Sequence, residues 1–222
     1  MDAILPAAGS AQRMSGIPKF LLPSDDKYTT LLENHIIGLS NICNKIYLPT
    51  RKNLIPLIES LNFNFESITI IEVETNTMSE TILEVLKKSD AENFLLAMPD
   101  TYFYGQKPYK LFNYEPTYAD IACWKIREEQ RGKLGEILFD DEGYVQKIID
   151  KNIETGFELA WGALTFSRKL TDYINKDDPH IGYALKHALD DNKKLTGFTV
   201  EGSYFDCGTP KEYIEMFKMI IK

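Results

Sequence analysis

Cysteine is scarce in this chain, and no Cys-x-x-Cys pair is present. The three cysteines, Cys43, Cys123 and Cys207, lie far apart in the sequence. Because they offer neither an even disulfide framework nor a metal-binding pair, they indicate a reducing compartment. The N-terminus has no basic leader, and no apolar run approaches the roughly 18 residues of a membrane span. We therefore expect a cytoplasmic protein without a membrane partner.

Positive charge is also in short supply. The 222 residues include 25 Lys and Arg against 33 Asp and Glu, which gives a net charge of −8. Nucleic acids and anionic membranes require a dense basic surface, so this balance argues against both as partners. A local basic pocket for a small phosphate is still compatible with it. The length and a hydrophobic content of 44% predict one folded domain over residues 1–222.

The first hundred residues alternate short β-rich runs with helical patterns. The expected strands are Asp2–Pro6, Lys45–Pro49, Ser67–Val73 and Asn93–Met98, and the expected helices are Thr30–Leu39, Asn53–Leu61 and Met78–Lys88. This alternation predicts an open, doubly wound α/β fold with a mixed, mainly parallel sheet and helices on both faces. In such folds ligands bind beyond the carboxyl ends of the strands. Functional residues are therefore expected just after Pro6, Val73 and Met98.

The pattern changes after Asp100, where strands predominate. The expected strands are Ile121–Ile126, Glu136–Phe139, Tyr144–Ile149 and Leu159–Phe166. The sequence Asp-Asp-Glu-Gly at 140–143 is a turn signal, so the second and third of these strands should form a hairpin. Helices are expected from Asp178-Pro179 to about Asp190, and from Thr209-Pro210 to the C-terminus, because each begins with a cap residue and a proline. The later half is thus predicted to form a hairpin-rich lobe.

Small residues and two cations follow the first strand. The segment Ala7-Ala8-Gly9-Ser10-Ala11 would let backbone N–H groups approach a phosphate chain, and Arg13 and Lys19 would add charged donors. The segment is neither Gly-x-Gly-x-x-Gly nor a Walker loop, so those two phosphate-binding folds are disfavoured. An ordinary strand-to-helix loop with two solvated cations is the alternative.

Two aspartates follow apolar runs elsewhere in the chain. Asp100 comes directly after the expected central strand, and Asp206 lies between an apolar run and a capped helix. If the two carboxylates meet at one edge of the sheet, they could hold Mg²⁺. Taken separately, each is better explained as a turn or cap residue. His180 and His187 could share a helical face, but with no third ligand evident, packing or surface roles are favoured over a metal site.

The order of these motifs resembles the sugar-1-phosphate nucleotidylyltransferase family, in particular its thymidylyl- and uridylyltransferases. The likeness covers nearly the whole chain. It rests on five segments: Leu5–Gly9 with Arg13-Met14 and Pro18-Lys19; Met98-Pro99-Asp100; Gly135–Asp140 with Gly143-Tyr144-Val145 and Asp150-Lys151; Trp161–Phe166; and Phe205–Pro210 with Tyr213. Each segment is moderately specific, and the five in the correct order form a strong signal.

The resemblance implies an activity and a role for each motif. The chain would condense a nucleoside triphosphate, with a pyrimidine base favoured, and a sugar 1-phosphate into a nucleotide sugar and pyrophosphate. Residues 1–105 would form the nucleotide-binding half and residues 106–222 the sugar-phosphate-binding half. The implied catalytic residues are Arg13 and Lys19, and the implied Mg²⁺ ligands are Asp100 and Asp206. The implied nucleotide-binding residues are Ala7, Ala8, Gly9, Ser10, Thr77, Ser79 and Glu80, and the implied sugar-phosphate-binding residues are Gly135, Asp150, Lys151 and Gly162.

Some positions depart from the family pattern and leave alternatives open. The first loop has one glycine where the family often has Gly-Gly-x-Gly, Pro99 replaces a glycine, and Asp150-Lys151-Asn152 replaces Glu-Lys-Pro. The Ala-Ala-Gly loop also occurs in cytidylyltransferases, so a cytidylyltransferase acting on a non-sugar phosphate is one alternative. An inactive nucleotide or sugar-phosphate sensor is another. A glycosyltransferase is disfavoured, because Asp100-Thr101-Tyr102 is not Asp-x-Asp. The base, the sugar and the oligomeric state, monomer or dimer, are not determined by the sequence.

Overall fold

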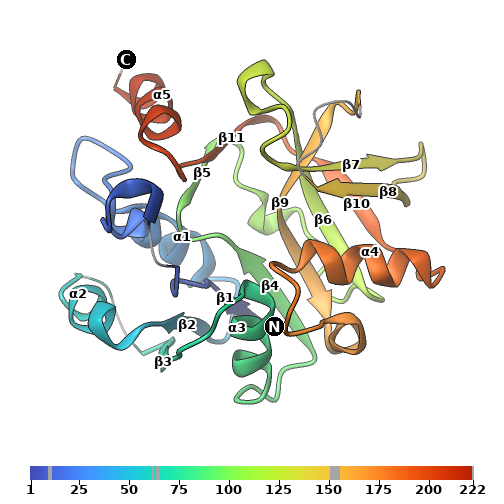
Figure 1. The fold of residues 1–222 in the computed structure, drawn as a ribbon, viewed down its shortest axis with the longest axis horizontal. Coiled ribbons are helices and arrows are strands. Elements are labelled where there is room, and N and C mark those ends of the chain that lie inside the picture. Colours follow the sequence, from blue (N-terminus) through green and yellow to red (C-terminus); the bar gives the residue numbers. More distant parts are fainter. Residues whose placement is uncertain (10–11, 62, 64–65, 151–155, 222) are drawn as a thin grey trace.

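A single mixed sheet forms the centre of the computed structural model, which describes residues 1–9, 12–61, 63, 66–150 and 156–221 (Figure 1). Nine of the described strands belong to this sheet, and its continuous order is β10-β6-β9-β4-β1-β2-β3. The parallel part consists of β1 (Asp2–Ile4), β2 (Ile46–Thr50), β3 (Ile68–Glu72) and β4 (Asn93–Ala97). Strand β4, whose apolar run Phe94–Ala97 is buried, lies in the middle, as this composition predicts for a strand covered on both faces.

The later strands extend the same sheet. They are β6 (Ala119–Lys125), β7 (Gly135–Phe139), β8 (Val145–Asp150), β9 (Leu159–Ser167) and β10 (Thr196–Thr199). Strand β9 pairs antiparallel with both β4 and β6, and β10 pairs parallel with β6. Strands β7 and β8 form the predicted hairpin, which joins the sheet where β7 pairs with β9. In Figure 1 this hairpin lies at the right.

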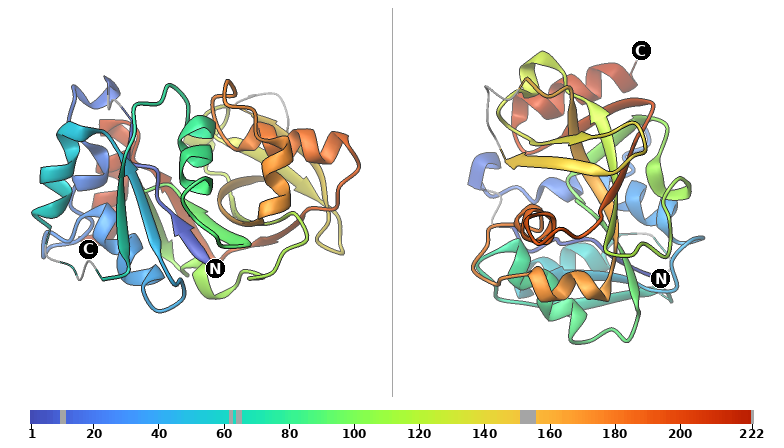
Figure 2. Two further views of the ribbon diagram at one scale, coloured as in Figure 1. Left: turned by 90° about the horizontal axis from the view of Figure 1, so that it is seen from below. Right: turned by 90° about the vertical axis from the view of Figure 1, so that its right-hand side faces the viewer.

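Helices cover both faces of the sheet, so the doubly wound fold expected from the sequence is confirmed (Figures 1 and 2). One apolar core contains buried residues of α1 (Leu31–Leu39) and α2 (Ile55–Glu59). A second core contains those of α3 (Met78–Leu86) and α4 (Gly182–Asp190). Strand β4 contributes Leu95 and Ala97 to the first core and Phe94 and Leu96 to the second, because successive side chains point to opposite faces.

A short second sheet was not predicted from the sequence. Strands β5 (Thr101–Gly105) and β11 (Gly202–Asp206) pair antiparallel, about a hundred positions apart in the chain. Helix α5 (Pro210–Ile220) follows β11 and lies at the top left of Figure 1. The described 3₁₀ segments are η1 (Gln12–Met14), η2 (Lys19–Leu21), η3 (Lys52–Leu54), η4 (Pro108–Lys110), η5 (Glu128–Gln130) and η6 (Arg168–Tyr173).

The starts of the later helices follow the sequence signals in one case and not in the other. The Thr209 hydroxyl caps α5 by accepting a hydrogen bond from the Glu212 N–H, as predicted. The prediction that the preceding helix begins at Asp178-Pro179 is wrong, because α4 begins at Gly182. The Pro179 carbonyl accepts a hydrogen bond from the Met78 N–H at 3.1 Å, which docks this segment against α3 instead. Tertiary contacts therefore override the local helix signal.

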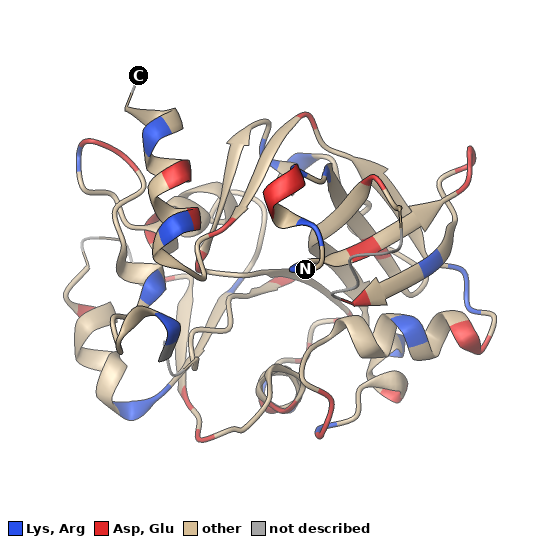
Figure 3. Cartoon of the chain, turned by 45° about the horizontal axis from the view of Figure 1, so that its top comes forward, with Lys and Arg blue, Asp and Glu red and all other residues tan. Residues whose placement is uncertain are grey.

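Positively and negatively charged residues both occur throughout the fold (Figure 3). Within the part of the chain that the structure describes, no helix combines the length and the apolar character that crossing a membrane requires.

Candidate functional site

The loop after β1 is fastened to the end of β2. The Ala7 N–H donates to the Pro49 carbonyl at 2.9 Å, and the Thr50 hydroxyl donates to the Ala7 carbonyl at 3.1 Å. Ala7 and Ala8 are buried, whereas Gly9 is exposed. A side chain added at Gly9 would meet nothing within 4 Å among the described residues, so open space lies above this backbone. Ser10, the other residue predicted to bind nucleotide here, lies outside the described residues.

Arg51 is a site residue that reasoning from the sequence missed. Its Nε donates a hydrogen bond to the Ala8 carbonyl at 2.8 Å, and the residue is exposed. The side chain therefore brings a third cation to the first loop. A signal was present, because Arg51 directly follows β2, and β2 lies beside β1 at the carboxyl edge of the sheet.

Lys19 and Asp100 form an ion pair across this edge. The Lys19 ammonium, from η2, contacts the Asp100 carboxylate at the end of β4. Their side chains are 16% and 21% exposed, so the pair is largely shielded but still reachable from solvent. One cation and one acid that were singled out in the sequence are thus direct partners.

Asp206 lies next to this pair because β11 runs beside β5. In the register of the small sheet, Asp206 is opposite Thr101, and the Cys207 N–H donates to the Asp100 carbonyl at 3.1 Å. Burial and the nearby Asp100 carboxylate raise the pKa of Asp206, while Lys19 and Arg13 act in the opposite direction. The two acids and two cations therefore lie within electrostatic range of one another.

The backbone at Gly208 leaves room for the Asp206 carboxylate. A Cβ at position 208 would lie 2.8 Å from Asp206 Oδ1, closer than real Cβ contacts allow. The Gly208 N–H also donates a hydrogen bond to this carboxylate, which lowers the pKa of Asp206. Glycine at this position thus permits the carboxylate to fold back over its own turn.

The two carboxylates suit a hard divalent cation that is completed by a substrate. Among the described residues, no group of three or more His, Cys, Asp or Glu is arranged to hold a metal ion by itself. Asp100 and Asp206 alone would supply two oxygen-bearing groups, and Mg²⁺ commonly uses one or two carboxylates together with substrate phosphates and water. The raised pKa of the half-buried Asp206 is consistent with a site where a bound cation would compensate negative charge.

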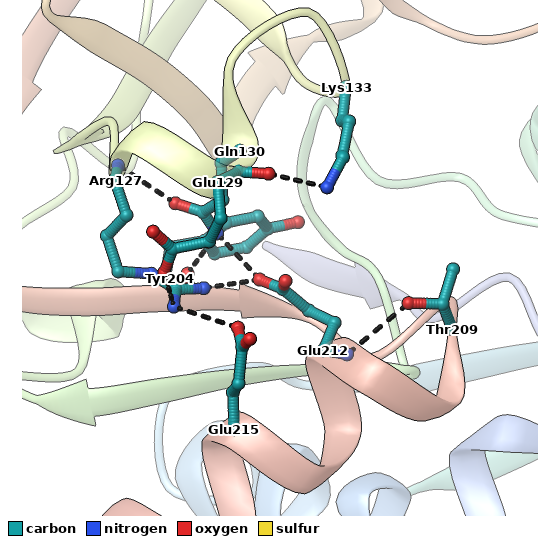
Figure 4. A network of polar contacts seen from close by, with 8 residues as sticks. All are labelled: Arg127, Glu129, Gln130, Lys133, Tyr204, Thr209, Glu212 and Glu215. Atoms are coloured by element: carbon teal, nitrogen blue, oxygen red, sulfur yellow. Dashed lines mark hydrogen bonds and ion pairs between the residues drawn. The ribbon is translucent and has the colours of Figure 1, made fainter.

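A polar network holds the segment around Asp206 against the loop after β6 (Figure 4). Gln130 Nε2 donates to the Tyr204 carbonyl at 2.8 Å and to Glu212 Oε1 at 2.9 Å. The Arg127 guanidinium pairs with Glu212 and lies 4.1 Å from the centroid of the Phe205 ring. Burial raises the pKa of Glu212, and the Arg127 charge partly offsets this shift. The network therefore fixes the strand that carries Asp206.

The residues predicted to lie near the nucleotide base occur at the start of α3. The Thr77 hydroxyl accepts from the Glu80 N–H at 3.0 Å and donates to the Lys176 carbonyl at 2.5 Å. Glu80 Oε2 accepts from the Asn76 N–H at 2.8 Å, and Ser79 is buried. In this arrangement they stabilise the helix start and its contact with residues 176–179. Their contact with a nucleotide stays a prediction.

Two of the residues predicted to bind the sugar phosphate meet on the hairpin. Gly135 and Asp150 are opposite each other in the β7–β8 pairing. The Trp161 indole covers Gly135 so closely that a Cβ there would overlap its Nε1. Asp150 Oδ2 lies 3.2 Å from Nε2 of His180, a residue for which the sequence favoured only a packing or surface role. Lys151 lies outside the described residues.

Gly162 does not lie with Gly135 and Asp150, because successive residues of β9 face opposite sides of the sheet. It follows Trp161 in the strand and is buried, with the position of its missing Cβ 2.5 Å from Tyr204 Cε2 and 3.0 Å from Trp124 Cζ3. Its observed contacts are those of a packing residue that admits the Tyr204 ring. A role in binding sugar phosphate stays a prediction.

Solved structures share this fold over the full chain. A Bacillus anthracis protein assigned as a glucose-1-phosphate thymidylyltransferase has a TM-score of 0.83 at 18% identity, covering 99% of this chain and 95% of that one. An inositol-1-phosphate CTP transferase from T. maritima has a TM-score of 0.80 at 17% identity, covering 100% and 96%. A UDP-glucose pyrophosphorylase complexed with UDP-glucose has a TM-score of 0.78 at 19% identity, covering 97% and 96%. At these identities the likeness shows the fold.

One curated protein also aligns with part of the sequence. The low-salt glycan biosynthesis nucleotidyltransferase Agl11 of Haloferax volcanii is 27% identical over 111 residues. The alignment covers 47% of this chain and 30% of the length of that protein. No model of a known protein family matches the chain. Both likenesses agree with the resemblance to nucleotidylyltransferases found in the sequence motifs.

Proposed function

We propose that this protein is a nucleotidylyltransferase that condenses a nucleoside triphosphate with a sugar 1-phosphate, giving a nucleotide sugar and pyrophosphate. The observation that carries the proposal is that the Lys19–Asp100 ion pair and Asp206 meet beyond the carboxyl edge of the parallel strands, with the Arg13 charge near enough to lower the pKa of Asp206. That edge is where open α/β sheets bind their ligands. The shared fold and the partial sequence likeness to a nucleotidyltransferase support the same activity.

The chemistry of this transfer requires positioning and charge compensation more than covalent help. A phosphate oxygen of the acceptor is already anionic at neutral pH, so it can attack the α-phosphorus without a general base. The new P–O bond forms in line with the bond that breaks, and the electron pair of that bond leaves with pyrophosphate. The barrier lies in joining two polyanions and in the charge that develops on the α-phosphate oxygens.

The residues at the edge of the sheet would each have a separate role in this reaction. The open backbone at Gly9 would receive the triphosphate, with Arg51 holding the loop in place. Arg13 and Lys19 would carry positive charge to the phosphate oxygens. Asp100 and Asp206 would hold Mg²⁺, which when bound neutralises phosphate charge and orients the α-phosphate. Lys19 would then exchange its contact with Asp100 for one with the triphosphate.

A second acceptor class has support of its own. The inositol-1-phosphate CTP transferase matches this chain over its entire length, so a cyclitol phosphate acceptor with CTP is the alternative within the same chemistry. The favoured pyrimidine base rests on the sequence resemblance. The sensor alternative requires binding of the same ligands without transfer.

Pyrophosphate release tests the proposal and separates these possibilities. The protein is incubated with Mg²⁺, each of the four common triphosphates and dTTP, and a panel of sugar 1-phosphates together with inositol 1-phosphate. We expect one pyrimidine triphosphate and one acceptor class to give pyrophosphate well above the remaining pairs. Nucleotide binding without pyrophosphate from any pair would contradict transfer and favour the sensor. As a control, Lys87→Ala removes an exposed cation that pairs with Glu84 on the surface of α3 and should leave the rate unchanged.

A further inference from the structure

A cleft of about 830 Å³ runs between the β8 strand and α4, beside the hairpin in Figure 1. One end is lined by Asp150, Trp161, His180 and Tyr183. A volume of this size falls within the range of small-molecule sites, which typically span about 300–1,000 Å³. The composition of this end, a carboxylate and an imidazole between aromatic rings, indicates what it could bind.

The contacts of His180 fix the position of its proton. Nδ1 lies 3.2 Å from the Gly182 N–H and accepts its hydrogen bond. A neutral imidazole that accepts at Nδ1 carries its proton at Nε2. Nε2 is the nitrogen 3.2 Å from Asp150 Oδ2, so the ring donates to that carboxylate. With its side chain only 14% exposed, His180 is a built-in partner of Asp150 rather than a solvated surface group.

The rings around this pair restrict the imidazole. The His180 ring packs edge-on against Tyr183, with centroids 5.1 Å apart, and lies 6.3 Å from the Trp161 ring. Trp161 in turn covers Gly135, which is opposite Asp150 across the hairpin. Aromatic rings present apolar faces, and Tyr and Trp add polar edges, so they suit ligands with both C–H faces and hydroxyls.

We propose that His180 is a positioning residue that holds the Asp150 carboxylate to accept hydrogen bonds from hydroxyl groups of a polyhydroxylated ring, with Trp161 and Tyr183 beside the ring. This inference rests on the proposed function, because the ring is that of the acceptor phosphate. An ionised carboxylate has about four acceptor positions, and His180 uses one of them. The remaining positions on the carboxylate would accept hydrogen bonds from the hydroxyls of the acceptor substrate, so deoxy analogues should bind poorly.

Three variants test this role. His180→Leu removes the donor to Asp150, whereas His180→Gln places an amide N–H where Nε2 was. His187→Leu is the matched control, because His187 lies in α4, which follows His180, and its side chain is 45% exposed and 3.7 Å from Asp178. Because hydrogen bonds to charged groups are among the stronger ones in proteins, we expect H180L to raise the KM for the acceptor roughly tenfold or more. The KM for the triphosphate and kcat should change less than twofold, H180Q should recover most of the loss, and H187L should match wild type.

Ligand binding without triphosphate separates this inference from the proposed function. The probes are glucose 1-phosphate, inositol 1-phosphate and a deoxy analogue of each, and the readout is tryptophan fluorescence, because Trp161 lines the cleft while Trp124 is buried. We expect at least one hydroxylated probe to bind wild type and H180Q more tightly than H180L, whether or not pyrophosphate is released. Binding of no probe to wild type, or equal binding by H180L and either of the other two proteins, would overturn the positioning role.

Discussion

The Lys19 ammonium contacts the Asp100 carboxylate, although 81 positions separate the two residues in the sequence. Lys19 comes from the segment after β1 and Asp100 from the end of β4, two strands that are neighbours in the sheet. The pair therefore places the first loop at the carboxyl edge where Asp206 also arrives. A metal ion and a triphosphate would be bound at the same place, so we expect this pair to separate when they bind.

Removing either cation should slow transfer strongly without unfolding the protein. Arg13→Ala and Lys19→Gln each delete one positive charge that would compensate phosphate charge. Loss of one such group typically costs about 10²–10³ in rate. Pyrophosphate release under saturating substrates measures the effect, and circular dichroism verifies the fold. Turnover at the wild-type level in either variant would exclude that residue from catalysis.

Asp206→Asn should abolish pyrophosphate release and, without divalent cations, stabilise the protein. Burial and Asp100 raise the pKa of Asp206 in the folded state, so the folded chain retains a proton that the unfolded chain releases. Asp206 therefore lowers the stability of the folded protein as the pH rises above 3.8, the ordinary pKa of an aspartate. The difference in melting temperature between D206N and wild type should therefore be larger at pH 7.5 than at pH 4. A smaller difference at pH 7.5 would show that the carboxylate is already stabilised.

His35 should make the protein sensitive to mild acid. Burial lowers its pKa to about 4, from an ordinary value of 6.5, and its Nε2 donates to the Thr101 carbonyl at 2.8 Å. Between these values the unfolded chain binds a proton that the folded chain does not. Its contribution to stability is therefore complete above pH 6.5 and is lost toward pH 4, with a slope of at most about 1.4 kcal/mol per pH unit.

Urea unfolding of wild type and His35→Gln across this pH range measures that contribution. The variant should be less stable at pH 7 and should lose less stability than wild type on acidification. His187→Gln is the control, because His187 is exposed and its substitution should leave the wild-type slope in place. Parallel curves of unfolding free energy against pH for wild type and H35Q would show that His35 does not set the acid sensitivity.

Glu212→Ala should destabilise the fold, because it removes the carboxylate that pairs with Arg127 and accepts from Gln130 in a largely buried network (Figure 4). Breaking a buried pair from one side costs about 3 kcal/mol, whereas replacing both partners with apolar groups is often neutral. The double variant Arg127→Met with Glu212→Leu should therefore recover most of the loss. Urea midpoints measure both, with Glu84→Ala at an exposed pair as the near-neutral control. A double variant no better than E212A would assign the stabilisation to the Arg127 ring contact instead.

The elements that were predicted correctly carry their signals locally. The apolar run of β4, the turn at 140–143 and the Thr209-Pro210 helix start each specify a structure through neighbouring residues. The small sheet of β5 and β11 was missed because its stability comes from pairing across about a hundred positions. The start of α4 was misplaced for a related reason, since Pro179 is held by Met78 of α3.

The candidate site also contains some residues that local sequence could indicate and others that depend on distant contacts. Asp100 and Asp206 could be singled out because each follows an apolar run, and Lys19 because it lies in the loop region after the first strand. That they lie together depends on the β5–β11 register. His180 could not be assigned, because its partner Asp150 is brought to it only by folding. Arg51 offered one signal, its position directly after β2, but its contact with the Ala8 carbonyl also arises only on folding. A side chain whose role is to hold another residue leaves little trace in one sequence.

Metal binding tests the central claim, that the two acids gather around a cation with the triphosphate, most directly. Mn²⁺ substitutes for Mg²⁺ as a spectroscopic probe, and electron paramagnetic resonance counts bound Mn²⁺ with a non-hydrolysable triphosphate present. We expect one tightly bound Mn²⁺ per wild-type chain, with much weaker binding in both Asp100→Asn and Asp206→Asn. Undiminished Mn²⁺ binding in the two variants would contradict the claim.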